Sequence, residues 1–316
     1  MTTALLHGLL AEAPPCIDAA DLRTWWQRGA PLRAEGEPVD CAVRCGWAAD
    51  RLGWAFAGGY HAALRRLVPD LGRAHLAALC ATEAGGAHPR AIESTLVRAA
   101  DGWVLSGHKR WGTLATAAET LFVVASTGSD AEGRKVLRVA RVPARAAGVT
   151  MKELPATPFA PEIPHAEVVF EGVHVVDAAL LPGDGWERWV KPFRTVEDAH
   201  VHAAVLGYLL GVARRHAWPE ATVEALLAAI VTVRGLALAD PASPAVHIAL
   251  AGLLAGTARL VAEFEPLWQR VTAEERQRWL RDRGLVEVAG RARAARRERA
   301  WQRLESPAEG DSRSGP

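Results

Sequence analysis

The spacing of apolar residues changes twice along this chain, and these two changes constrain its fold more than any other feature. Over residues 18–78 apolar side chains recur at helical spacing, which predicts two or three helices with a turn or helix break at Gly58-Gly59. Between residue 79 and about residue 182, short apolar runs are separated by Gly and Asp turns, which is the pattern of consecutive β-strands. After Asp184 the helical spacing returns.

The predicted architecture is therefore a multi-layer α+β fold, with a β-domain between two helical segments. Short strands that follow one another through tight turns form an antiparallel sheet or barrel, and not βαβ units. We expect strands over residues 121–125, 136–142 and 166–176. The predicted domains are N-terminal helices over 1–78, a β-barrel-like middle domain over 79–186, a C-terminal helical bundle over 187–304 and a polar, disordered tail over 305–316.

Helix signals define the start of the C-terminal bundle. Thr195-Val-Glu-Asp198 has the form of a capping box, which predicts that a helix begins at Thr195. This helix should run to about His216, and Pro219 should end it. Two further helices are predicted over Glu220–Leu238 and Ala245–Trp268.

The last predicted helical segment, Thr272–Leu304, is strongly basic. It contains ten Arg residues between positions 276 and 303, against Asp282, Glu287 and Glu298. We expect it to face solvent or another subunit, and the alternative is a site for a nucleotide phosphate or another anionic partner.

Charge and cysteine content argue against several classes of protein. The formal net charge is +1, so no global charge draws the chain to nucleic acid or anionic membrane. The four cysteines lack the two close pairs of a zinc finger, so free thiols in a reducing cytoplasm are expected. The start lacks the basic region of a targeting segment, and the longest apolar stretches, near 225–233 and 248–261, are too short or too interrupted to span a bilayer. These features predict a cytoplasmic protein without a membrane span.

Two histidines, His200 and His202, could suggest a metal site. No third ligand stands at a suitable spacing, so zinc is not expected.

Two segments of the strand region carry the strongest functional signal. They read Leu79-Cys-Ala-Thr-Glu-Ala-Gly-Gly86 and Asp101-Gly-Trp-Val-Leu-Ser-Gly-His-Lys-Arg-Trp-Gly-Thr113. The first resembles the Thr-Glu-Pro strand end and Gly-rich turn of the acyl-CoA dehydrogenase family, and the second resembles that family's Trp-Ile-Thr hairpin. Residues 166–175 and 181–186 resemble the end of the same family's middle domain. The resemblance covers residues 79–186, and the helices on either side match by pattern only.

The resemblance implies a flavoprotein fold and an FAD cofactor. A flavin ring needs hydrogen bonds to its polar edge and a flat apolar wall on one face. By resemblance, Thr82 would bond the pyrimidine edge, while Trp111 and Thr113 would lie against the ring and near its N5 atom. The alternative is an ordinary β-hairpin in which Trp111 is a core residue.

Several positions depart from the family's pattern. The Pro after Thr-Glu is Ala84, the following Gly-Ser-Asp is Gly86-Ala-His88, and the Ile of Trp-Ile-Thr is Gly112. The Arg-x-x-Phe-Gly after the first C-terminal helix, the Gln-x-x-Gly-Gly motif and the late Glu-Gly-Thr, which carries the family's commonest catalytic Glu, have no counterpart in the sequence. The N-terminal helical domain is also shorter than the family's. These departures concern the family's cofactor contacts and its general base.

Glu197 is the candidate for a general base. A minority branch of the family carries its catalytic Glu on the first C-terminal helix, about ten residues before Leu-Gly or Val-Gly, and Glu197 precedes Leu206-Gly207 at that spacing. The family's Arg at the next position is Asp198. A Glu in the first turn of a helix would be stabilised as the anion by the helix dipole. The alternative is that Glu197 only caps a helix.

The leading hypothesis for function is an FAD-dependent acyl-CoA, or other acyl thioester, dehydrogenase that forms an α,β double bond with hydride transfer to flavin. Its partners would be the acyl thioester, an electron-transfer flavoprotein and further subunits, in a homo-oligomer or a hetero-oligomer with a homologue. One alternative is a catalytically degenerate family member that acts as a partner subunit or an acyl- or flavin-binding protein. Another is a flavin oxidase or monooxygenase of the same fold. Nucleic acid is not an expected partner, because no nucleic-acid motif accompanies the Arg-rich segment.

Overall fold

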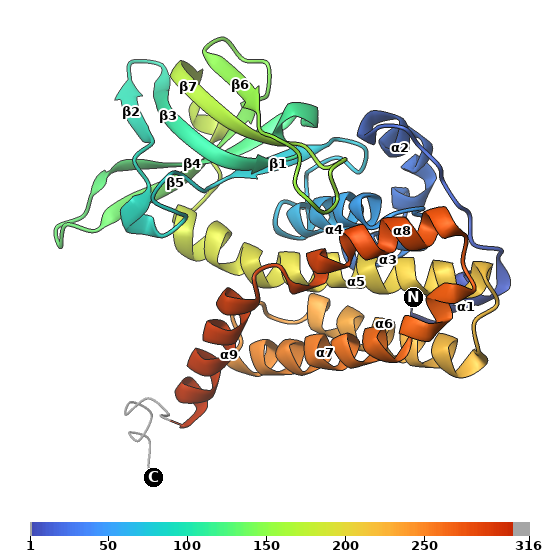
Figure 1. Ribbon diagram of the computed structural model, residues 1–316. Helices are drawn as coiled ribbons and strands as arrows, with labels where there is room; N and C mark the ends of the chain where they lie inside the picture. Colours follow the sequence, from blue (N-terminus) through green and yellow to red (C-terminus); the bar gives the residue numbers. More distant parts are fainter. Residues whose placement is uncertain (1, 306–316) are drawn as a thin grey trace.

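A computed structural model describes residues 2–305 and has three parts in chain order, as predicted (Figure 1). The tail expected over 305–316 lies outside the described residues from residue 306 onward. The helices of the first part are α1 (Thr2–Ala11), α2 (Leu22–Arg28), α3 (Pro38–Trp47) and α4 (Leu52–Leu67). The strands of the second part are β1 (Ala77–Cys80), β2 (Thr95–Ala99), β3 (Gly102–Thr113), β4 (Thr120–Ser129), β5 (Lys135–Pro143), β6 (Val149–Glu153) and β7 (His165–Val175). The helices of the third part are α5 (Lys191–Arg215), α6 (Glu220–Leu238), α7 (Pro244–Glu263), α8 (Ala273–Asp282) and α9 (Gly290–Glu305).

The middle domain is one seven-stranded, largely antiparallel sheet. Its strand order is β1-β4-β2-β3-β7-β6, and β5 also pairs with β4. The three segments expected to be strands lie in β4, β5 and β7, so that prediction is confirmed. Only the pairings of β1 and β2 with β4 are parallel. The sheet has its own buried core, and β1 lies at the edge that faces α4 and α5 (Figure 1).

The central helix of the molecule is α5, which runs between the sheet and the layer formed by α6 and α7 (Figure 1). It packs against α3 and α4, and glycines allow the helix backbones to approach closely. A Cβ on Gly46 would lie 1.9 Å from the carbonyl oxygen of Ala204, and a Cβ on Gly59 would lie 2.6 Å from the Cα of Val201. The predicted break at Gly58-Gly59 is therefore wrong: both glycines lie inside α4, where their missing side chains make room for other helices.

The start of α5 also differs from the prediction. Thr195 is not its N-cap, because a π-helical turn over Trp186–Val190 leads directly into α5 at Lys191. Asp184 caps this entry instead, since its carboxylate accepts hydrogen bonds from the backbone N–H groups of Trp186 and Glu187 at 2.9 and 2.8 Å. The ends predicted for α5 and α6 agree with the structure.

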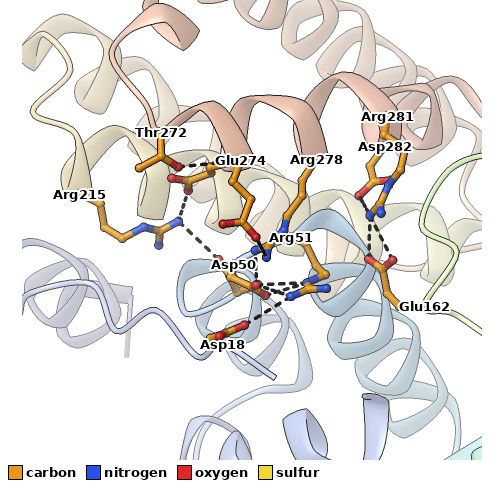
Figure 2. A network of polar contacts seen from close by, with 12 residues as sticks. Asp18, Asp50, Arg51, Glu162, Arg215, Thr272, Glu274, Arg278, Arg281 and Asp282 are labelled. Carbon is orange, nitrogen blue, oxygen red and sulfur yellow. Dashed lines mark hydrogen bonds and ion pairs between the residues drawn. The ribbon is translucent and has the colours of Figure 1, made fainter. Parts of the chain in front are cut away.

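The basic segment after residue 272 is divided into two helices, α8 and α9, by a short 3-10 turn. Ion pairs hold α8 to the rest of the molecule (Figure 2). Arg278 contacts Asp50 at 2.5 Å, and Arg281 contacts Glu162 at 3.1 Å. The sequence indicated a solvated or subunit-facing segment, whereas α8 is tied to the loops before α4 and after β6.

Two C-terminal helices are long and apolar. By length and composition alone, α6 and α7 could cross a bilayer, and they are longer than the apolar stretches that the sequence suggested. Helix α6 packs against α5 and α3, and α7 packs against α6 and α9. Core helices of a folded domain have the same length and composition, so this finding is weak evidence for a membrane span.

Candidate active site

A buried ion pair joins the two sequence motifs of the β-domain. The ammonium group of Lys109, in β3, lies 2.5 Å from a carboxylate oxygen of Glu83, in the turn after β1. That carboxylate also accepts hydrogen bonds from the backbone N–H of Glu93 and from the N–H and hydroxyl of Ser94. Because Lys109 is fully buried, the pair fixes the turn after β1 against β3. Both residues lie in the two sequence motifs, but no local pattern signals that they pair.

The same contact places Thr82 beside Trp111. The backbone N–H of Arg110 donates to the carbonyl oxygen of Thr82 at 2.9 Å. The register of β3 and β7 shifts between Lys109 and Gly112, and Trp111 has a positive φ of 66°. Side chains normally alternate between the two faces of a strand, and such a bulge changes the direction in which a side chain points. Trp111 is 52% exposed, so it is not a residue of the sheet's core.

Thr113 ends β3 on the far side of this bulge. Its hydroxyl lies 3.3 Å from Nδ1 of His165, whose ring is also edge-on to Trp111 with 6.4 Å between ring centroids. Burial lowers the pKa of His165, so this imidazole is neutral near pH 7. The structure thus brings Thr113, Trp111 and His165 together, and the Arg110 backbone bond brings Thr82 next to Trp111.

Glu197 lies in a separate pocket of about 560 Å³, lined by α5, α9 and the segment between α6 and α7. It is in the second turn of α5, not the first, so stabilisation of its anion by the helix dipole does not apply. Burial, followed by the neighbouring Asp198 carboxylate, raises the pKa of Glu197 to about 8. The prediction of an anion favoured by its helix position is wrong, because burial dominates at this residue.

Asp198 has a different role from its neighbour. It is buried and forms ion pairs with Arg293, at 2.8 Å, and with Arg296, both on α9. By resemblance, the family carries an Arg at position 198. In this chain that position is Asp198, and the Arg side chains beside it come from α9. The acidic residue at 198 and the Arg-rich last helix were both visible in the sequence, but only the fold pairs them.

One aromatic contact and one longer-range electrostatic influence connect the Glu197 pocket to the region of the β-domain. The Glu197 carboxyl is close enough to contribute, after burial, to the raised pKa of Tyr60, and the Tyr60 hydroxyl accepts a hydrogen bond from the N–H of Leu79 in β1 at 2.9 Å. Trp186, which lines the pocket, lies 6.1 Å from the ring of His88 in the turn after Thr82. Over residues 2–305, the lining of this pocket does not include Thr82, Trp111 or Thr113. Trp186 therefore brings one end of this pocket near the turn that follows β1.

The two histidines of α5 are buried helix residues. Nδ1 of His200 lies 2.7 Å from the carbonyl oxygen of Val196, and Nε2 of His202 lies 2.8 Å from the hydroxyl of Thr257. Burial lowers the pKa of each to about 4, so both are neutral at physiological pH. Within residues 2–305, no three His, Cys, Asp or Glu side chains are grouped as a metal site requires.

Comparison with known proteins supports the resemblance noted in the sequence. Residues 78–173 match the model of the acyl-CoA dehydrogenase middle domain. A curated relative, the probable acyl-CoA dehydrogenase YngJ of Bacillus subtilis (strain 168), is 29% identical over 133 residues, which cover 42% of this chain. The match spans 33% of that relative's length.

Solved structures extend the similarity to the whole fold. The prolyl acyl carrier protein oxidase AnaB superposes with a TM-score of 0.72 at 14% identity, over 96% of this chain and 99% of the other. Butyryl-CoA dehydrogenase from Megasphaera elsdenii superposes with a TM-score of 0.68 at 14% identity, over 96% of this chain and 97% of the other. Residues 78–173 are thus similar to the acyl-CoA dehydrogenase middle domain, and the whole chain has the fold of that family.

The residues of the β-domain fit a flavin ring. Trp111 presents a half-exposed aromatic surface, the Thr113 hydroxyl lies beside His165, which is edge-on to Trp111, and Thr82 is bonded through its backbone to Arg110, the residue before Trp111. An aromatic surface flanked by hydrogen-bonding groups is what a flavin ring requires. The family motifs that would bind the rest of FAD are absent from the sequence. The agreement between these residues and the cofactor therefore concerns the flavin ring alone.

Proposed function

We propose that this protein is an FAD-dependent oxidoreductase that introduces an α,β double bond into an acyl thioester. The observation that carries the proposal is the position of Glu197: an ionisable, partly buried carboxyl that lines a pocket of about 560 Å³, whose Trp186 lies beside His88 of the β-domain. A pocket of this volume accommodates a thioester-bearing ligand.

In this proposal Glu197 is the catalytic base. The α-carbon of the thioester is positioned beside its carboxylate, which takes the α-proton as the α C–H bond breaks. A base with a pKa of about 8 is strong enough to assist this transfer and is partly ionised near neutral pH. After burial, the Asp198 carboxylate raises that pKa further, and Asp198 itself pairs with two Arg side chains of α9.

The flavin ring is held by Thr82, Trp111 and Thr113. When bound there, it supplies the acceptor for the hydrogen and the two electrons that leave the β-carbon. The Glu83–Lys109 pair positions this part of the protein without contacting the ring, because it keeps Thr82 and Trp111 adjacent.

Reconstitution with FAD tests the proposal. The purified protein is incubated with FAD, freed of excess cofactor and mixed without oxygen with acyl-CoA thioesters of several chain lengths. We expect loss of the visible flavin absorbance and a product with two hydrogens fewer. Glu197→Gln should retain FAD and slow the loss of absorbance by about 10²–10⁴-fold. Failure to retain FAD, or equal rates in the two proteins, would contradict the proposal.

A second candidate function is an oxidase on an acyl thioester. It is favoured by the similarity to the prolyl acyl carrier protein oxidase AnaB, which superposes over nearly the whole chain. The same experiment separates the two candidates. In an oxidase the reduced flavin is rapidly reoxidised when air is admitted, whereas in a dehydrogenase it stays reduced until a protein electron acceptor is added.

A further inference from the structure

Four arginines gather beside the first half of α3 without a carboxylate partner. Arg33 ends the 3-10 turn Ala30–Arg33, Arg44 lies in α3, Arg65 lies near the end of α4, and Arg73 lies in the loop before β1. Over residues 2–305 none of the four forms an ion pair, and the oxygen atoms that accept their hydrogen bonds belong to backbone carbonyls. Arg33 and Arg65 are buried, and burial lowers the pKa of both. The cluster is therefore a concentration of uncompensated positive charge.

Two carboxylates close to the cluster in sequence are engaged elsewhere. Asp40 pairs with Arg234 at 2.7 Å, and Asp70 pairs with Arg141 at 2.8 Å. Glu35 contacts the cluster through its backbone carbonyl oxygen, and the residue is exposed. The cluster thus has spare positive charge that these side chains do not neutralise.

The side chain on which the arginines converge is Cys41, in α3. Its sulfur lies 3.6 Å from a guanidinium nitrogen of Arg44, 3.9 Å from one of Arg73 and 4.0 Å from one of Arg65. Three charged donors therefore surround one sulfur atom. Negative charge that develops on an atom bound to this sulfur would be stabilised by them.

The cluster also has hydrogen-bonding groups that are left unused. Nε of Arg65 and both ring nitrogens of His61 are buried and have no partner over residues 2–305. Burial, followed by the charges of Arg33 and Arg65, lowers the pKa of His61 to about 3, so this ring is neutral near pH 7. Unpartnered buried polar groups accompany a bound water or ion, or a redox role. An oxygen atom added to the Cys41 sulfur would lie within this cluster.

We propose that Cys41 is a modification site, at which hydrogen peroxide or another small hydroperoxide oxidises the thiol to a sulfenic acid. The sulfur attacks one peroxide oxygen, so an S–O bond forms and the O–O bond breaks. The thiol proton leaves with the departing oxygen; hydrogen peroxide gives water, and Cys41 carries an S–OH group. The sulfur loses two electrons, and the peroxide gains them. Arg44, Arg65 and Arg73 stabilise the departing oxygen, because negative charge develops on it before it is protonated.

The other three cysteines serve as internal controls. Cys45 and Cys80 are buried, and burial raises the pKa of their thiols to about 11 and about 12. Cys16 is exposed, whereas Cys41 is 2% exposed. The Cys41 sulfur is nevertheless close to the surface, because it lies 3.3 Å from the carbonyl oxygen of the exposed Glu35. Exposure alone predicts that Cys16 reacts first, and the arginine cluster predicts Cys41.

Oxidation of the folded protein tests this proposal. The reduced protein, freed of reductant, is treated with hydrogen peroxide for set times, and catalase ends the reaction. It is then unfolded in urea with dimedone, which labels sulfenic acids, and iodoacetamide, which labels the remaining thiols, and mass spectrometry measures each cysteine. We expect Cys41 to be oxidised at least about tenfold faster than Cys16. In protein unfolded before peroxide is added, the arginines no longer surround the sulfur, so the rate at Cys41 should fall to that at Cys16.

A double variant tests the arginines directly. Arg44→Gln/Arg65→Met should slow the oxidation of Cys41 by at least about tenfold. The matched control is Arg66→Met, at the next position of α4, whose side chain bonds the carbonyl oxygen of Ala237 and should not affect the rate. Circular dichroism establishes that each variant is folded.

Two results would overturn the proposal without any variant. One is oxidation of Cys16 as fast as that of Cys41 in the folded protein, and the other is a rate at Cys41 that does not fall on unfolding. Both comparisons stand even if the double variant fails to fold. An unchanged rate in a folded double variant would also contradict the role of the arginines. Neither FAD nor a thioester takes part, so the outcome is independent of the function proposed above.

Discussion

The buried pair of Glu83 and Lys109 permits a quantitative test of how the proposed flavin-binding surface is held together. Lys109→Met leaves a buried carboxylate that keeps three hydrogen-bond donors, from Glu93 and Ser94 at 2.7 to 3.1 Å. Glu83→Met leaves a fully buried ammonium group without another partner among the described residues, and it also deprives those three donors of their acceptor. The two single variants should therefore differ in stability.

We expect Lys109→Met to lower the free energy of unfolding by about 2–3 kcal/mol and Glu83→Met to lower it by about 4–5 kcal/mol. The double variant should lose less than the sum of the two, because neither charge is then left unpaired. Lys152→Met, at an exposed position of β6, is the matched control and should change stability by less than about 0.5 kcal/mol.

Urea unfolding followed by tryptophan fluorescence measures these differences. Hydrogen exchange at the Arg110 amide, which is bonded to the carbonyl oxygen of Thr82, reports whether the turn after β1 has loosened. We expect faster exchange at this amide in both single variants. If Lys109→Met costs as much as Glu83→Met, or if exchange at Arg110 is unchanged, the pair does not position this surface.

Three further predictions follow from the packing and the charges. Gly46→Ala should destabilise the protein by about 3 kcal/mol or more in urea unfolding, since the new Cβ would meet a backbone carbonyl oxygen at 1.9 Å, whereas Gly235→Ala, with nothing within 4 Å, should be neutral or stabilising. Trp111→Ala should weaken FAD binding by about tenfold in a fluorescence titration, and Trp301→Ala, an exposed Trp of α9, should not change it. Asp198→Asn removes a charge that raises the pKa of Glu197, so the pH dependence of flavin reduction should move to lower pH.

The layer order could be read from the sequence because each layer has its own period of apolar residues. The turn at Asp101-Gly102 marks the start of β3 irrespective of what packs on it, and the strands are where the pattern placed them, although Thr127-Gly128 lies at a register shift inside β4 and not at its end. Local rules failed where tertiary contacts decide. Gly58-Gly59 continues a helix because other chain segments lie against both residues, and the capping signal at Thr195 is overridden by the earlier cap at Asp184.

Only part of the candidate site could be predicted from the sequence. Trp111 stood in a recognisable motif, but the bulge that turns it outward depends on the pairing of β3 with β7. The contact of Glu83 with Lys109 spans 26 residues, and that of Asp198 with Arg293 spans 95. No periodic pattern encodes such distances. The raised pKa of Glu197 likewise comes from burial under segments that are distant in the sequence.

The pH dependence of flavin reduction tests the central claim, that Glu197 is the base of a flavin-dependent site. In the protein reconstituted with FAD and mixed with an acyl thioester without oxygen, the carboxyl of Glu197 is neutral below its pKa of about 8 and becomes a base above it. The rate of absorbance loss should therefore rise about tenfold per pH unit below that value and level off above it. In Glu197→Gln the residual rate should lack this step. Reduction that is independent of pH in the unaltered protein, or that shows the same step in Glu197→Gln, would contradict the assignment.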